Sequence, residues 1–170
     1  MRRAGVTLAG LVLLASAPAC GTPDSSFPPE PVCATPEPIA TSRSVVGVTS
    51  PAAFLMHIRN STTELLRARD AFAEEYPDDT FYRRDAFRPD MAAFADNLIC
   101  SASSLRQLES PIARFDGWTA SLHIALDELL EWTRFGRDAV RSRNVSEYRE
   151  FRAGLDERLS VVERIAYTSP

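Results

Sequence analysis

The feature that most constrains this chain is a run of apolar positions between residues 115 and 139, spaced by alternating steps of three and four. This spacing places one apolar stripe along a helix, and its heptad period is the pattern with which helices pack side by side. A single helix cannot bury such a stripe, so the segment requires partner helices. The stripe comprises Phe115, Trp118, Leu122, Ala125, Leu129, Trp132, Gly136 and Ala139.

Three further segments after residue 50 repeat steps of three and four. Their stripes are Phe54, Ile58, Ser61, Leu65, Ala68, Phe72 and Tyr76; then Met91, Phe94, Leu98, Ala102, Leu105 and Leu108; then Val145, Tyr148, Phe151, Leu155, Leu159, Val162 and Ala166. Four amphipathic helices with mostly short connections predict an all-α protein, an antiparallel up-down four-helix bundle. We therefore expect a bundle domain over residues 50–168.

Prolines and polar capping residues indicate where the helices begin. The predicted starts are Ser50-Pro51, Arg88-Pro89-Asp90, Ser110-Pro111 (with Asp116 as an alternative N-cap) and Asn144. Residues 77–79 are expected to stop the first helix. The segment 80–88 is either a packed loop or an additional helical turn.

The first 19 residues have the pattern of a secretory signal peptide. Arg2 and Arg3 precede an apolar run from residue 4 to residue 17, which is shorter than the roughly 20 residues of a transmembrane helix. Ala17 and Ala19 fit the small residues that general signal peptidase requires. Residues 20–49 begin with a stretch rich in Gly, Ser and Pro, and we expect them to form an extended tether and leader.

The end of the apolar run, Ala17-Pro18-Ala19-Cys20, resembles the lipobox of bacterial lipoproteins, although those proteins usually carry leucine at the position of Ala17. The resemblance implies that Cys20 carries a lipid and becomes the first residue of the exported protein. The protein would then be anchored to a membrane at the cell surface or on its periplasmic side. Cleavage by general signal peptidase is the alternative and would release a secreted protein.

A second resemblance covers about residues 105–165, which are similar to a loosely defined group of uncharacterised bacterial exported helical proteins. The matching features are Leu105 and Leu108, Pro111, His123, the break at Arg143-Asn144, and the helix from Tyr148 to Val162. The chain departs from the group at Asn144, where a Gly-Asp turn is commoner. This resemblance implies an exported bundle and no known activity.

The three cysteines divide naturally if Cys20 carries lipid. Cys33 and Cys100 then remain as a pair, and such pairs are normally oxidised outside the cytoplasm. We predict a disulfide between Cys33 and Cys100 that joins the leader to the bundle. The alternative is two separate cysteines, with Cys100 a buried apolar residue.

His123, Asp127 and Glu131 follow one another by four residues and lie on one face of the predicted third helix. Such a face can form a metal or acid–base site. The competing interpretation is a polar flank in which the histidine makes local hydrogen bonds.

Catalytic and cofactor motifs are not found in the chain. It has no lysine, G-x-S-x-G, H-E-x-x-H or glycine-rich phosphate loop, so we do not expect an enzyme. Met56, His57 and Met91 are residue types that bind copper or haem, but without C-x-x-C-H they are better explained by core packing. We expect no cofactor.

An aromatic and basic segment between the first two predicted helices is a candidate partner-binding loop. Its candidate residues are Phe81, Tyr82, Arg83, Arg84 and Phe87, with Arg88 beside them. The competing interpretation is a loop whose aromatic rings cover one end of the bundle. Nucleic acid is not expected as a partner, because loss of the signal leaves 17 basic against 23 acidic residues.

A second group of arginines, Arg137, Arg141, Arg143 and Arg149, surrounds the break before the fourth predicted helix. The negative end of a helix dipole favours most of these positions, and contact with anionic lipid head groups is an alternative.

Together these patterns predict an exported, lipid-anchored helical bundle with a non-catalytic binding or structural role at the cell envelope. An envelope protein is the expected class of protein partner. The alternative is a small-ligand or metal binder that uses the bundle core near His123.

Overall fold

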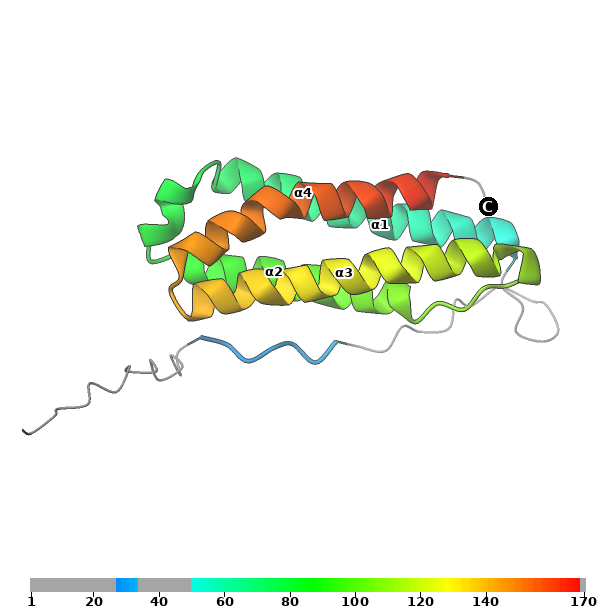
Figure 1. Cartoon of the computed structure of the whole chain (residues 1–170), viewed down its shortest axis with the longest axis horizontal. Coiled ribbons are helices and arrows are strands. Elements are labelled where there is room, and N and C mark those ends of the chain that lie inside the picture. Colours follow the sequence, from blue (N-terminus) through cyan, green and yellow to red (C-terminus); the bar gives the residue numbers. More distant parts are fainter. Residues whose placement is uncertain (1–26, 34–49, 169–170) are drawn as a thin grey trace, which may run out of the picture.

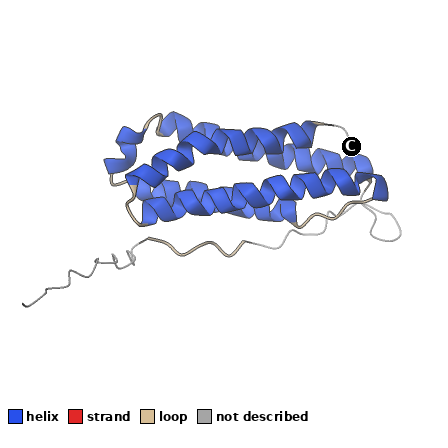
Figure 2. Ribbon diagram, viewed as in Figure 1, coloured by secondary structure: helices blue, strands red, loops and turns tan. Residues whose placement is uncertain are grey.

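The computed structural model describes residues 27–33 and 50–168 (Figure 1). The described part is helical apart from its loops, with no strands (Figure 2). Its elements are α1 (Pro51–Glu75), η1 (Asp79–Arg83), α2 (Phe87–Arg106), η2 (Ala113–Phe115), α3 (Asp116–Arg141) and α4 (Val145–Tyr167), where η denotes a short 3-10 helix. The predicted signal peptide, Cys20 and most of the predicted tether lie outside the described residues.

The four long helices form an antiparallel up-down bundle, which confirms the predicted fold. Successive helices run in opposite directions, and α1 and α3 each contact both α2 and α4 (Figure 1). None of the described helices is long and apolar enough to cross a membrane.

The predicted stripes form most of the core. Phe54, Leu98, Leu129 and Phe151 are among the buried residues, one from each long helix. The two tryptophans of the α3 stripe are only partly buried. The indole N–H of Trp118 donates to the carbonyl oxygen of Ile165 at 2.9 Å, and that of Trp132 donates to Phe151 at 2.9 Å. These bonds tie α3 to α4 while each ring keeps one edge at the surface.

Two predicted helix starts are confirmed with their caps. The Ser50 hydroxyl accepts from the backbone N–H of Ala53 at 3.2 Å, and the Asn144 side chain accepts from that of Glu147 at 3.3 Å. Each cap satisfies an N–H group that the first helical turn leaves without a partner. The additional turn considered between the first two helices is present as η1.

The other two starts differ from the prediction. Helix α2 begins at Phe87, just before the predicted Arg88. The third start at Ser110-Pro111 is wrong, because the Ser110 hydroxyl donates to the carbonyl oxygen of Ile112 at 2.7 Å and Ile112 is extended. Asp116 is the first residue of α3 rather than its N-cap.

Helices α3 and α4 approach closely at Gly136. A Cβ atom added at this position would overlap the ring of Phe151, which belongs to the α4 core stripe. The ring is buried, so it has no free space into which it can move. Glycine is therefore required here by packing against the facing helix.

We predict that Gly136→Ala lowers the free energy of unfolding by about 1–3 kcal/mol through overpacking. Gly117→Ala is the matched control, since a Cβ atom there meets nothing within 4 Å. Alanine at that helical position should raise stability by up to about 1 kcal/mol. Urea denaturation of both variants checks the prediction, and equal stabilities would contradict it.

Candidate functional site

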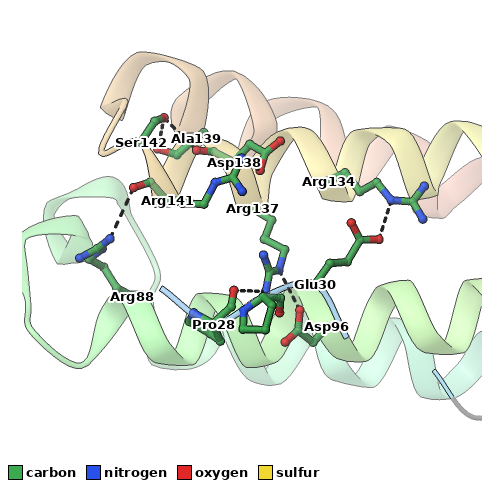
Figure 3. Close-up of polar contacts among 11 residues, drawn as sticks. Pro28, Glu30, Arg88, Asp96, Arg134, Arg137, Asp138, Ala139, Arg141 and Ser142 are labelled. Carbon is green, nitrogen blue, oxygen red and sulfur yellow. Dashed lines mark hydrogen bonds and ion pairs between the residues drawn. The ribbon is translucent and has the colours of Figure 1, made fainter. Parts of the chain in front are cut away.

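The described N-terminal segment, Phe27–Cys33, lies along α2 and α3 and is here called the leader strap (Figures 1 and 3). Phe27 lies near Tyr82 and Arg83 of η1 and Arg143 of the α3–α4 turn, and the residue is only 8% exposed. It belongs to the same cluster of buried side chains as the helix stripes. The strap is therefore packed as part of the bundle.

Arg137 of α3 is the central contact of the leader strap. Its side chain is almost fully buried, and its Nε donates to the carboxylate of Asp96 on α2 at 2.8 Å. Its Nη2 donates to the carbonyl oxygens of Pro28 and Pro29 at 2.7 and 2.6 Å (Figure 3). The guanidinium carbon lies 5.0 Å from the centre of the Phe27 ring. One cation thus joins α2, α3 and the strap.

Two further contacts fix the rest of the strap. Glu30 accepts from Arg134, one helical turn before Arg137, at 2.8 Å. Cys33 forms a disulfide with Cys100 of α2, which confirms the predicted pairing. The bond joins positions 67 residues apart, so it restricts the unfolded chain strongly.

A cavity of about 660 Å³ opens where the strap meets the end of the bundle. Phe27 and Pro28 of the strap form part of its wall. Its charged lining residues are Arg83, Arg84, Asp85 and Arg88 before and within α2, and Arg143 in the α3–α4 turn. Four arginines therefore line this space with one carboxylate, and we call it the basic cavity.

Arg143 has a backbone conformation that usually belongs to glycine. Its φ is 59°, and it is the one non-glycine residue with positive φ among those described. Its N–H donates to Val140 at 3.2 Å, and the N–H of Asn144 donates to Ala139 at 2.7 Å, which is the Schellman ending of a helix. An arginine at this position costs about 1 kcal/mol relative to glycine.

Two acidic residues near the arginines bind hydroxyl groups. Asp90 accepts from the Tyr76 hydroxyl, and this bond, together with burial, raises the pKa of Tyr76 to about 12. Asp78 accepts from the hydroxyl and backbone N–H of Thr80, and these bonds lower the pKa of Asp78. Asp78 thus helps to hold η1, and Asp90 joins the end of α1 to α2.

The structure divides the aromatic and basic candidates into two groups. Phe87 is fully buried against the rings of Tyr76, Tyr82 and Tyr148, so its assignment to a partner-binding surface is wrong. Tyr82, Arg83 and Arg84 line the basic cavity. The side chain of Phe81 lies outside the described part of the structure.

His123 is engaged by hydrogen bonds within the protein. Its Nε2 lies 3.1 Å from the carbonyl oxygen of Leu108, and its Nδ1 lies 3.1 Å from Nη1 of Arg106. Because a carbonyl oxygen only accepts, these contacts assign the proton to Nε2 and make Nδ1 an acceptor. Burial, and then the charge of Arg106, lower the pKa of His123 below its ordinary value of 6.5.

The proposed ligands beside His123 do not form a metal site with it. Nε of Arg106 donates to both carboxylate oxygens of Asp127 at 2.9 and 3.0 Å, and Glu131 is exposed. Within residues 27–33 and 50–168, no three His, Cys, Asp or Glu side chains are grouped so that they could hold a metal ion. The local hydrogen-bond network proposed as the competing interpretation is what the structure contains.

The most important residue that the sequence analysis misassigned is Arg137. We grouped it with Arg141 and Arg143 and explained the positions of these arginines by the helix dipole. Arg141 does pair with Asp138 at 2.8 Å on the surface, whereas Arg137 is buried. The available signal was a second stripe on α3 that includes the arginine, namely Leu126, Leu130, Thr133, Arg137 and Val140.

We predict that Arg137→Met lowers the free energy of unfolding by about 2–4 kcal/mol, because Asp96 and two proline carbonyls lose a buried donor. Arg134→Met is the matched control on the same helix. Its pair with Glu30 is about half exposed, so the loss should be less than about 1 kcal/mol. Similar losses in both variants, measured by urea denaturation, would contradict the role given to Arg137.

His123 predicts a pH dependence of stability. Its folded-state pKa is lowered, so the unfolded chain takes up a proton first as the pH falls below about 6.5. The free energy of unfolding should therefore be highest above that pH and should fall below it. In His123→Gln this fall should be smaller. Unfolding by urea between pH 7.5 and 5 measures this, with His57→Gln as the control. If His123→Gln and the wild-type chain lose stability equally as the pH falls, the role given to His123 is refuted.

Comparison with protein-family models, with curated proteins and with solved structures returned no match for this chain.

Proposed function

We propose that this protein is exported, is anchored to a membrane by a lipid on Cys20, and acts as a non-catalytic binding or structural module at the cell envelope. The observation that carries the proposal is the leader strap held by the Cys33–Cys100 disulfide. Structural disulfides persist in oxidising compartments and are rare in the cytosol of most cells. The disulfide supports export, and the lipobox-like motif supports the anchor.

The arrangement of the strap suits a load-bearing connection. A pull on the chain before Phe27 would act first on the contacts of Phe27 and Arg137, and then on the covalent bond at Cys33. The disulfide ends that path on α2, at a partly buried position. Residues 34–49 would therefore carry little of the load, and the bundle would stay attached through α2.

The polar groups around His123 and Arg137 hold the fold, which supports a structural role for this part of the bundle. Arg106 engages His123 and Asp127, and Arg137 engages Asp96 and the strap. An envelope protein is the class of protein partner that we propose.

The anchor is tested by growing bacteria that express the chain with radioactive palmitate. The wild-type chain should become labelled, and Cys20→Ser should not, because it removes the only proposed acceptor. Cys100→Ser is the matched control, since it removes a different cysteine and should keep the label. An unlabelled wild-type chain would contradict the anchor.

The disulfide gives an independent test of export. In cells, Cys33 and Cys100 should resist alkylation by a maleimide until a reductant is added. When the chain is expressed without residues 2–19, both should be alkylated without reductant. Alkylation of both cysteines in the unaltered chain would refute export to an oxidising compartment.

A further inference from the structure

The basic cavity is assembled from three segments that are distant in the sequence. The leader strap contributes Phe27 and Pro28, the segment at the start of α2 contributes three arginines, and the α3–α4 turn contributes Arg143. Arg88 connects these segments, because its Nη2 lies 3.5 Å from the carbonyl oxygen of Arg141 and its guanidinium carbon lies 5.6 Å from the centre of the Phe27 ring. The cavity therefore depends on a docked strap.

The charge of the lining contrasts with that of the protein. The whole chain has a net charge of −4, yet four arginines and one aspartate line the basic cavity. An adjoining cavity of about 280 Å³ shares Tyr82 and Arg83 with it and adds Arg149. Guanidinium groups match the geometry of both phosphate and carboxylate oxygens. A phosphate monoester carries about two negative charges at neutral pH, so it suits a lining of four arginines and one aspartate better than a single carboxylate does.

The size and the remaining walls indicate an organic phosphate. The larger cavity is in the range that accommodates small organic molecules, well above what a bare phosphate ion needs. Rings from Phe27, Pro28, Tyr82 and Pro89 line it beside the arginines. The Tyr82 hydroxyl donates to the carbonyl oxygen of Ala139 at 3.4 Å, so the aromatic ring is what Tyr82 contributes to this wall.

The backbone of Arg143 is a second and separate indication. Glycine would fit the left-handed conformation at this helix end without strain, yet the chain places an arginine there, lining the cavity. Strained non-glycine residues concentrate at binding sites.

The position of the cavity relative to the anchor rests on the proposed function. Six residues separate Cys20 from Phe27, so a lipid on Cys20 would hold this end of the bundle within about 25 Å of the membrane surface. The opposite end is farther away by the length of the helices, about 38 Å for α1. The basic cavity would then lie at the membrane-proximal end of the molecule.

We propose that the basic cavity binds the phosphate of an organic phosphate monoester or diester, with Arg83, Arg84, Arg88 and Arg143 as the anion-binding side chains. The phosphate belongs either to the head group of an anionic phospholipid or to a soluble organic phosphate. Phe27 and Tyr82 contact the organic part of the ligand.

The test is isothermal titration calorimetry on the full chain, purified from expressing cells in a nonionic detergent. The probes are glycerol 1-phosphate and short-chain dihexanoyl phosphatidylglycerol, with glycerol and dihexanoylglycerol as their phosphate-free counterparts. Binding of both phosphate probes with similar affinity identifies a soluble phosphate as a sufficient ligand. Binding of the phosphatidylglycerol alone identifies the lipid head group. Binding by neither phosphate probe, or equal binding of the phosphate-free counterparts, overturns the proposal.

Arg143→Gly is the decisive variant, because glycine relieves the backbone strain while the charge is lost. We expect affinity to fall by about tenfold with an unchanged or higher melting temperature. Arg67→Gln is the matched control on α1, where the exposed arginine pairs with Glu64, and its affinity should stay within about twofold of wild type. Equal losses in the two variants would mean unspecific attraction and would overturn the proposal.

These probes dissolve in water and do not require a lipid on Cys20. If the chain binds the phosphate probes but is not labelled with palmitate, only the proposed anchor is contradicted. Palmitate labelling without phosphate binding would contradict only the cavity assignment.

Discussion

The buried guanidinium of Arg137 is the interaction on which the described N-terminal segment depends. A cation at 3% exposure is costly unless its donors are satisfied, and here a carboxylate from α2 and two carbonyl oxygens from the strap receive them. Pro28 and Pro29 suit this arrangement, since proline has no N–H to satisfy and restricts the unfolded chain. The strap therefore supplies two of the three acceptors that stabilise the buried arginine.

The strap in turn connects the two functional proposals. Its disulfide to α2 supports export and gives a tether that ends on a helix of the bundle, and its first two residues complete the wall of the basic cavity. An anchored chain would thus present the arginine-lined end of the bundle toward the membrane. The two proposals remain separable, because the cavity is built from residues of the folded domain and the anchor from Cys20.

The sequence predicted those parts of the structure that depend on local chemistry. Apolar spacing predicted four helices, and Ser50-Pro51 and Asn144 predicted where two of them begin. The disulfide joins positions 67 residues apart and was predicted from the number of cysteines instead. The start of α3 was missed because Ser110 bonds to a nearby carbonyl rather than to a helix N–H. Arg137 was missed for a different reason. Its partner Asp96 lies 41 positions earlier, and helical spacing does not show which face of α2 meets which face of α3.

The most direct test of the central claim is to observe the strap on the bundle in solution. Nuclear Overhauser effects between the Phe27 ring and the side chain of Arg137 report this contact without any substitution. We expect such cross-peaks, with ring-shifted resonances for the arginine, in the oxidised protein. Random-coil shifts for Phe27, with no cross-peaks to α3, would contradict it.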